Sequence, residues 1–204
     1  MSVEVYLAYV LTCILITIIP GPTVTLIIAN SLTHGTRAGL LNVAGTQLGL
    51  AIMLGVLLVG LSSVIAAMGV WFDYVRIAGA VYLVWLGWKL LRANAGLGQF
   101  GTTPKPRGGF FLQGFLVLMS NPKALLWFGA FIPQFVDPAG NYVGQIVLLG
   151  ATAMVTAAIT DGAYAVLGGR TGRVMSAGRI RLASQLGGVF LIGGGVWLAV
   201  TRTR

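Results

Sequence analysis

The sequence has 204 residues, of which 57% are hydrophobic and only 8% are charged, and its formal net charge is +9. Because about a quarter of the residues in a soluble domain are charged, this composition argues against a soluble protein and indicates a membrane protein. The basic residues lie in short stretches between apolar segments, where the rules of membrane orientation place them. We therefore expect a single transmembrane domain, residues 1–204, that contacts the lipid bilayer and binds no nucleic acid.

Six apolar segments follow one another along the chain. Each approaches or exceeds the roughly 20 residues that a helix needs to cross a bilayer, so the predicted fold is all-α, a polytopic membrane protein with six transmembrane helices. The first segment is too long for a signal-peptide core and follows Glu4 instead of a basic stretch, so we expect it to stay in the mature protein. The predicted segments are 5–29, 39–67, 70–91, 110–133, 142–168 and 183–201.

The first segment is interrupted near its middle by two prolines and a glycine. A proline lacks an amide hydrogen and clashes with the carbonyl four residues back, so Pro20 and Pro22 should free the carbonyls of Ile16 and Ile18. Such a broken backbone persists inside a membrane only in a protein interior or a water-lined cavity, and transporters use broken helices at their binding sites. The predicted substrate path therefore includes Pro20, Gly21, Pro22 and Thr23.

The second segment carries polar side chains beside a pair of glycines spaced four residues apart, Gly45 and Gly49. Small residues at this spacing let helices approach closely, so packing is the favoured role of this segment. The run Gly193–Gly195 in the last segment indicates the same, either within one subunit or between the subunits of a homodimer. The polar residues of the second segment that could instead line a pore are Asn42, Thr46 and Gln47.

The fourth segment contains the motif Asn121-Pro122-Lys123. Pro122 should free the Leu118 carbonyl. Lys123 lies some ten or more apolar residues from each end of the segment, too far to reach an interface easily. A lysine near the bilayer centre costs about 2.5–3.5 kcal/mol on insertion scales, so such residues usually face a partner or water and mark function. We therefore include Asn121, Pro122 and Lys123 in the candidate site.

The fifth segment contains Asp161, the one acidic residue well inside a predicted span. Residues four apart lie on one face of a helix, so Thr152, Thr156, Thr160 and Tyr164 form a polar stripe with Asp161 beside it. We interpret Asp161 as a candidate proton carrier with Lys123 as its partner, and Thr156, Thr160 and Tyr164 as candidate pore-lining residues. A structural, hydrogen-bonded acid is the alternative.

The loop charges predict an orientation. The bases lie in alternate loops that should fall on the cytoplasmic side, which places both termini outside; a re-entrant first segment would instead place the N-terminus inside. The tryptophans should largely be interface anchors and lipid-facing residues. The bases on the predicted cytoplasmic side are Arg37, Lys89, Arg92, Lys105, Arg107, Arg170, Arg173, Arg179 and Arg181, and the opposite side receives Glu4, Asp73, Arg76, Asp137, Arg202 and Arg204.

The two halves of the chain resemble each other in three places that occur in the same order. With three spans in each half, the second half would be inverted relative to the first, as in many carriers. We therefore predict two inverted three-helix repeats, residues 1–95 and 108–204. The matches are Gly79–Gly87 with Gly187–Gly195, Gly39 and Gly45 with Gly144 and Gly150, and Pro20 and Pro22 with Pro122.

The sequence contains few residues suited to enzymatic chemistry. One histidine, one cysteine and four acids are scattered along the chain, so no metal cluster, disulfide framework or Ser-His-Asp set is expected. A nucleotide-binding glycine loop is also missing. We expect neither an enzyme nor a cofactor.

With these residues in place, the chain resembles the LysE/RhtB family of bacterial amino-acid exporters over nearly its whole length. The resemblance implies a secondary exporter of amino acids such as lysine, arginine, threonine, homoserine or leucine in the bacterial inner membrane, driven by an ion gradient. In many relatives the residue after Pro-Gly-Pro is Asn or Asp, whereas here it is Thr23. The matching motifs are Pro20–Pro22, His34–Leu40, Gly45, Gly49, Tyr82–Lys89, Gly114-Phe115, Asn121–Lys123 and Phe131–Phe135.

The residues and the resemblance together predict an exporter of amino acids of the homoserine, threonine, lysine and leucine class that works by proton antiport. An amino acid is a zwitterion, so free carbonyls could accept from its ammonium, and helix N-termini with Lys123 could bind its carboxylate. Two alternatives share these features in part. One is a carrier of another small solute, and the other is a membrane scaffold or assembly factor.

Overall fold

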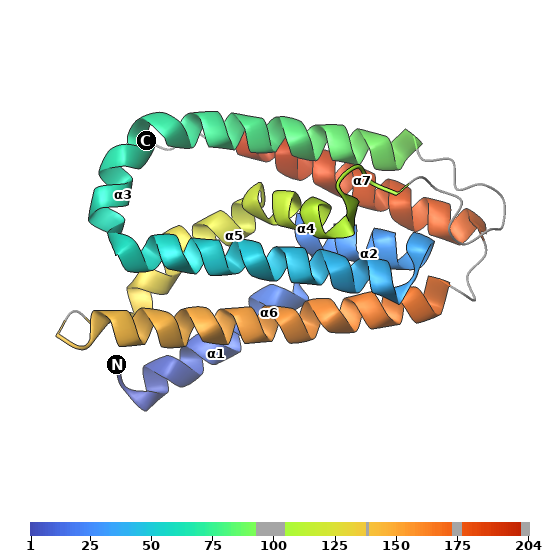
Figure 1. The fold of residues 1–204 in the computed structure, drawn as a ribbon. Coiled ribbons are helices and arrows are strands. Elements are labelled where there is room, and N and C mark those ends of the chain that lie inside the picture. The colour runs from blue at the N-terminus through green and yellow to red at the C-terminus, as the bar shows by residue number, and fades with distance from the viewer. Residues whose placement is uncertain (93–104, 138, 173–176, 201–204) are drawn as a thin grey trace.

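The computed structural model describes residues 1–92, 105–137, 139–172 and 177–200, with the backbone alone described for some helical residues, among them 60–76, 122, 179–181 and 197. These residues form long helices that lie side by side (Figure 1). The elements are α1 (Val3–Ile18), α2 (Pro22–His34), α3 (Thr36–Arg92), α4 (Gly109–Met119), α5 (Pro122–Leu126), the π-helix η1 (Trp127–Phe131), the 3₁₀ helix η2 (Ile132–Phe135), α6 (Tyr142–Gly172) and α7 (Ala177–Val200).

The all-α architecture agrees with the predicted fold class. Within the described residues, Thr36–Val59 and Tyr142–Gly172 are each long and apolar enough to cross a membrane, and α1 with α2 would add a third span if this bent pair counts as one. Three shorter apolar helices accompany them, at Ile77–Lys89, Gly109–Met119 and Gln185–Val196. The chain is therefore an all-helical membrane protein with two or three candidate spans, and the count of six stays a prediction.

The structure differs from the predicted segments in α3. The segments expected at 39–67 and 70–91 are the two limbs of this one helix, which runs along the molecule, turns at one end and returns (Figure 1). A proline would have broken the helix between the limbs, but the sequence has none there. The backbone therefore stays helical around the turn.

Two breaks interrupt the apolar segments that contain the prolines. The axes of α1 and α2 differ by 50° across the break, where Ile19 and Gly21 adopt extended backbone. The second break, Ser120 and Asn121, separates α4 from α5. Pro22 and Pro122 each stand at the start of the following helix, where the missing amide hydrogen costs nothing. Both prolines thus end one helix and begin the next.

Glycines allow close contacts between helices. A Cβ atom added at Gly87 would lie 2.5 Å from the Gly188 carbonyl oxygen, and one at Gly195 would lie 2.8 Å from the Ala80 oxygen, so the returning limb of α3 packs tightly on α7. Gly195 therefore packs within the chain. A Cβ at Gly193, in contrast, would meet nothing within 4 Å.

The glycines of the first limb of α3 pack against α4. A Cβ at Gly45 would collide with the Phe111 backbone, and one at Gly49 would lie 2.5 Å from the Leu118 side chain. From the other side, a Cβ at Gly114 would collide with the backbone of Asn42. The glycines spaced four apart therefore do serve packing.

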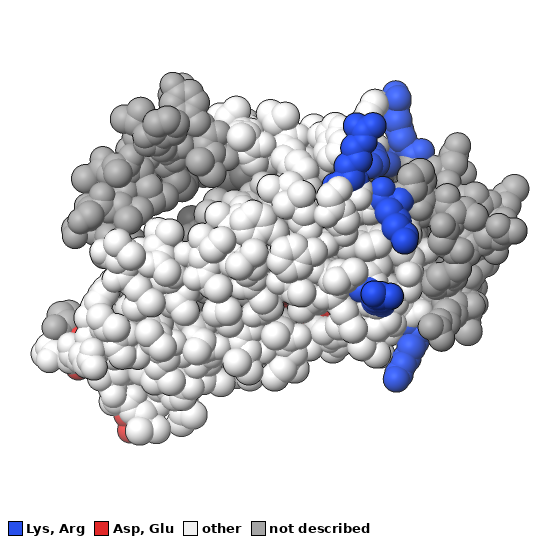
Figure 2. Space-filling model, in the orientation of Figure 1, with Lys and Arg blue, Asp and Glu red and all other residues white. Residues whose placement is uncertain are grey.

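Charged side chains separate toward the two ends of the molecule. Figure 2 shows Lys and Arg gathered at one end, with the visible Asp and Glu side chains mainly toward the other. The end with the acids is also where α1 begins and α7 ends (Figure 1). This arrangement agrees with the predicted alternation of loops, while the side that faces the cytoplasm stays a prediction. The bases whose side chains are described, apart from the partly buried Lys123, are Arg37, Lys89, Arg92, Lys105, Arg107 and Arg170; the side chains of Asp73, Arg76, Arg173, Arg179, Arg181, Arg202 and Arg204 lie outside the described part.

The tryptophans divide into two groups. Trp85 and Trp88 are about half exposed, as expected for residues at a lipid surface. Trp127 is buried in the largest core cluster beside Tyr9, so its prediction as an interface anchor was wrong. Trp127 begins the π-helix η1, and hydropathy alone gives no signal for which of its side chains face inward. Trp71 and Trp197 lie outside the described side chains.

Replacing Gly114 by Ala should lower the stability of the protein. The new methyl group would meet the carbonyl oxygen and Cα of Asn42, and such overpacking costs about 1–3 kcal/mol. The matched control is Gly55→Ala, because a Cβ there meets nothing within 4 Å and alanine favours helix by up to ~1 kcal/mol. Thermal unfolding in detergent would measure both, and equal shifts would contradict the packing argument.

Candidate functional site

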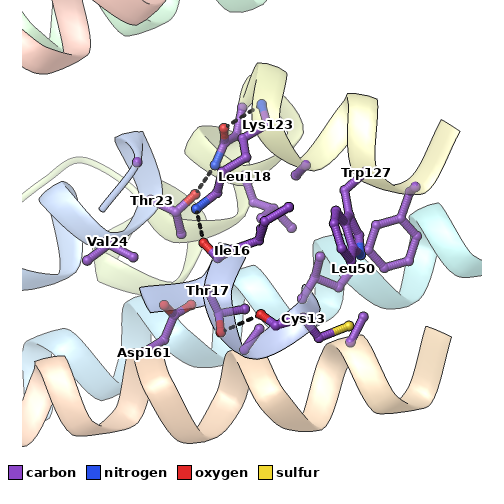
Figure 3. A pocket seen from close by; sticks show the side chains of 16 residues that line it. Cys13, Ile16, Thr17, Thr23, Val24, Leu50, Leu118, Lys123, Trp127 and Asp161 are labelled. Atoms are coloured by element: carbon purple, nitrogen blue, oxygen red, sulfur yellow. Dashed lines mark hydrogen bonds between the residues drawn. The ribbon is translucent and has the colours of Figure 1, made fainter. Parts of the chain in front are cut away.

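The last turn of α1 ends in carbonyl groups that accept hydrogen bonds from distant side chains. Lys123 Nζ donates to the oxygen of Ile16 at 3.0 Å (Figure 3) and to that of Ile19 at 2.8 Å. The Tyr164 hydroxyl donates to the oxygen of Ile18 at 2.9 Å. The carbonyls that Pro20 and Pro22 were expected to free at Ile16 and Ile18 are therefore open to side-chain donors.

At the second break, the carbonyl at the end of α4 accepts a hydrogen bond from the neighbouring backbone. The Leu118 oxygen, expected to be free, accepts from the backbone N–H of Asn121 at 2.9 Å. This tight turn closes the end of α4 before α5 begins. The prediction that Leu118 offers a carbonyl to a ligand was therefore wrong, because the backbone folds back on itself.

Electrostatics favour Lys123 in this position. The C-terminus of a helix carries a partial negative charge, and a cation there gains typically 0.3–1 kcal/mol, and up to ~2 kcal/mol when partly buried. Lys123 is partly buried, and two carbonyls at the end of α1 accept its ammonium protons. The ammonium therefore replaces the helical hydrogen bonds that the first break removed.

The two breaks are in direct contact through Asn121. Its Nδ2 donates to Thr23 Oγ1 at 2.7 Å, across 98 residues of sequence. Its Oδ1 accepts from the backbone N–H of Lys123 at 3.0 Å and so caps the start of α5. Asn121 is 2% exposed and Thr23 is 5% exposed. One buried amide thus begins α5 and ties it to the first turn of α2.

A cavity of about 80 Å³ lies where the breaks meet. Polar groups from both breaks line it together with Asp161 of α6, and Cys13, Trp127 and Phe128 add apolar walls (Figure 3). Leu50 and Ala157, near the middles of Thr36–Val59 and of α6, also line it. The cavity therefore lies near mid-depth of the two longest candidate spans.

Asp161 faces this cavity from the side opposite Lys123. It is 6% exposed, and in Figure 3 it points from α6 toward the end of α1, which lies between the two residues. Among the described residues, no hydrogen bond reaches its carboxyl group, and no ion pair within 4 Å joins it to Lys123. A buried acid with no such partner is costly and therefore a strong candidate for function.

The residues of the polar stripe on α6 have different hydrogen-bond partners. The hydroxyls of Thr156 and Thr160 donate to carbonyls one turn earlier in their own helix, and neither side chain lines the cavity. The Thr152 hydroxyl likewise donates to the Leu148 carbonyl of its own helix at 2.8 Å, and it also meets the Tyr6 hydroxyl of α1 at 3.0 Å. Of the stripe, Tyr164 alone bonds to the break, through the Ile18 carbonyl.

The residues singled out in the second segment lie away from the cavity. Asn42 is fully buried, donates to the Phe110 carbonyl at 2.6 Å and accepts from Asn30 at 2.8 Å. Asn30 also donates to Gln113 at 3.0 Å, so buried amides link α2, α3 and α4. Sequence reasoning did not give Asn30 this role; the signal that could have indicated it is the recurrence of amide side chains inside apolar segments.

The other two polar residues of that segment differ from each other. The Thr46 hydroxyl donates to the Val43 carbonyl of its own helix at 2.7 Å. Gln47 has a buried Nε2 with no hydrogen-bond partner among the described residues. Neither side chain lines the cavity, so their part in a pore stays a prediction.

The Pro-Gly-Pro motif forms the backbone of the first break, and its side chains do not fill the cavity. Pro20 is exposed on the outside of the break, while Gly21 and Pro22 are buried. A Cβ at Gly21 would lie 3.5 Å from Lys123 Nζ, so this glycine lies against the ammonium. The side chain of Pro122 lies outside the described part.

Comparisons with known proteins agree over almost the full chain. Residues 14–202 match the family model described as LysE type translocator. A membrane protein of Vibrio cholerae is 31% identical over 99% of this chain and 100% of its own length. A homoserine/homoserine lactone efflux protein of Salmonella typhi is 34% identical over 83% of each chain, and a leucine efflux protein of Salmonella choleraesuis is 31% identical over 80% of this chain and 78% of its own. No solved structure matches.

The bond between the breaks should appear as an energetic coupling. Thr23→Val removes the acceptor and Asn121→Ala removes the donor, so a double-mutant cycle should give about 0.5–1.5 kcal/mol of interaction. Unfolding of the purified protein in denaturant would measure it. As a control, Thr46→Val combined with Asn121→Ala should be additive, since the Thr46 hydroxyl bonds only its own helix. Additivity in both cycles would show that the contact contributes nothing.

Proposed function

Because the chain belongs to the family of LysE-type translocators, which are transporters and not enzymes, we propose that it exports amino acids across the bacterial inner membrane by proton antiport. Relatives named as efflux proteins for homoserine and for leucine support this activity. The observation that carries the proposal is the mid-depth cavity lined by one cation, Lys123, and one acid, Asp161.

The cavity has the charges that a zwitterion requires. The substrate carboxylate would bind Lys123 and the amides at the start of α2, where a helix N-terminus favours an anion. The substrate ammonium would bind the carbonyls of Ile16 and Ile19, which already accept from an ammonium group. The rest of the wall is mainly apolar, with Leu50, Leu118 and Trp127 among its residues, which favours an uncharged side chain over that of lysine or arginine.

Lys123 would then do two things in turn. With the cavity empty of substrate, its ammonium occupies the carbonyls at the end of α1. When a substrate carboxylate enters, Lys123 moves to pair with it, and the substrate ammonium takes the vacated carbonyls. The end of α1 keeps a cation throughout, so its carbonyls need never be left without a donor inside the membrane, where each lost bond costs several kcal/mol.

Asp161 is the proposed proton carrier. A carboxyl group that is buried, lines the cavity and has no hydrogen-bond partner among the described residues is suited to gain and lose a proton as the cavity changes its access. Exchange of an outward-moving amino acid for an inward-moving proton would link export to the proton gradient. Thr156 and Thr160, on the same helix, would then maintain the helix and not carry the proton.

The inverted arrangement of two halves is also part of the proposal. Each half contains a helix that stops, a break, and a second helix that starts at a proline. The matched stretches Gly79–Gly87 and Gly187–Gly195 pack against each other through Gly87 and Gly188. Both features support six spans in two inverted repeats, with the basic end of Figure 2 in the cytoplasm.

Loss of the Lys123 ammonium should abolish transport. We expect Lys123→Met to lower the efflux of homoserine and leucine at least tenfold, because both the carboxylate partner and the α1 donor disappear. Efflux of radiolabelled amino acids from overexpressing cells, with and without an uncoupler, measures this. Lys105→Met, at an exposed position, is the control. Normal efflux by correctly inserted Lys123→Met protein would refute the proposed site. If the protein were a membrane scaffold, it would tolerate Lys123→Met as well as Lys105→Met.

Asp161→Asn should uncouple export from the proton gradient. In proteoliposomes with an imposed pH gradient, we expect the variant to lose gradient-driven uptake or efflux while it still exchanges labelled for unlabelled substrate, because exchange needs no net proton movement. Thr160→Val, one residue away with a hydroxyl bonded to its own helix, should keep full coupling. Unchanged gradient dependence in Asp161→Asn would refute the proton role. A panel of other small solutes tests the alternative substrate class.

A further inference from the structure

A second, external groove runs between the returning limb of α3 and α7. Its volume is about 480 Å³, and apolar side chains line it. On α3 the walls come from Ile77, Val81 and Trp85, and on α7 from Ile192, Val196 and Val200. Each set recurs every four residues and so forms a stripe along one helix face. The groove is therefore a continuous apolar surface on the outside of the molecule.

The floor of the groove lies close to the two helix backbones. Ala80 and Gly195 line it, and because Gly195 has no side chain its backbone lies close to the Ala80 carbonyl, which a Cβ there would approach to 2.8 Å. The walls stay open: Val81 is 63% exposed and Val200 is 69% exposed. The groove can therefore receive a slender apolar group between its two walls.

Two cation–aromatic pairs mark one end of the groove. Trp85 and Trp88 both line it. The ammonium of Lys89 lies 5.3 Å from the centre of the Trp85 ring, and the guanidinium carbon of Arg92 lies 3.9 Å from that of Trp88. This end coincides with the basic end of the molecule in Figure 2. The apolar groove thus ends at two exposed cations, each of which lies against an aromatic ring.

The length of the groove matches one leaflet of a bilayer. Ile77 and Trp88 are eleven residues apart on α3, which corresponds to about 17 Å at 1.5 Å per residue. Half of a hydrocarbon core of about 30 Å is about 15 Å. Tryptophan belongs at the boundary between the hydrocarbon and the headgroups, so the cations beyond it lie at the depth of lipid phosphates.

We propose that this groove is a binding site for an anionic phospholipid. One acyl chain lies between the α3 and α7 stripes, Trp85 and Trp88 flank the glycerol region, and Lys89 and Arg92 bind the phosphate. The site is separate from the cavity at the breaks and does not depend on the proposed transport activity. Basic pockets between transmembrane helices bind such headgroups in other membrane proteins.

A second copy of the chain fits this surface less well. A two-fold axis along the membrane normal would bring the same surface of both copies together at the same depth. Lys89 and Arg92 of one copy would then face Lys89 and Arg92 of the other, and like charges in an interface are costly. An anionic headgroup removes that repulsion, because it supplies the opposite charge where the groove ends.

The test measures quenching of tryptophan fluorescence by lipid. The full-length protein is reconstituted in phosphatidylcholine nanodiscs that contain increasing fractions of phosphatidylglycerol with brominated acyl chains. Brominated phosphatidylcholine serves as the comparison lipid. We expect saturable quenching at several-fold lower fractions of the anionic lipid, because bromines in the groove lie against Trp85 and Trp88.

Two variants with equal loss of charge separate a specific site from general attraction. Lys89→Gln with Arg92→Gln should abolish the preference for phosphatidylglycerol. Arg37→Gln with Arg170→Gln removes two positive charges from the same end of the molecule, away from the groove, and should keep it. Three outcomes would each overturn the proposal. They are an equal loss of the preference for phosphatidylglycerol in both double variants, no such preference in the unmodified protein, and a protein dimer that covers the groove and excludes the lipid.

Discussion

The fold depends on one requirement, which is that carbonyl groups freed inside a membrane must find donors within the protein. Pro20 and Pro22 end α1 early and deprive its last turn of helical partners. Lys123 and Tyr164 supply the missing donors from α5 and α6. The carbonyls at the first break therefore depend on donors that other helices supply. This requirement brings an ammonium, a tyrosine and two helix starts to one place, and the cavity is what remains between them.

The same requirement explains why the site is central. A lysine in the interior of a membrane protein is costly alone, and so is an unpaired carbonyl. A hydrogen bond between the ammonium and the carbonyl removes both costs. Asn121 extends the arrangement, because its amide caps α5 and also bonds Thr23 of α2. The two breaks thus hold each other in place. Asp161 stands outside these bonds, which leaves its carboxyl group available to a ligand or a proton.

Much of this could be predicted from the sequence because proline and charge act locally. The positions of the breaks, the free carbonyls of Ile16 and Ile18 and the central place of Lys123 all follow from residue chemistry. The closure of the Leu118 carbonyl could not be foreseen, since it depends on a turn of two residues. The burial of Trp127 and the particular partners of Asn30 and Asn42 could not be foreseen either, because hydropathy does not say which face of a helix turns inward.

The contact between Lys123 and the end of α1 also constrains how the protein is assembled. Lys123 lies 107 residues after Ile16, and Tyr164 lies 146 residues after Ile18. A chain that emerges from the ribosome N-terminus first has neither donor when its first segment reaches the membrane. The bent form of that segment should then be unstable in lipid, so the segment enters as a shallow or straighter helix and bends after α5 and α6 have arrived. Completion of the cavity at the breaks would therefore be among the last events of folding, and truncated chains would lack it altogether.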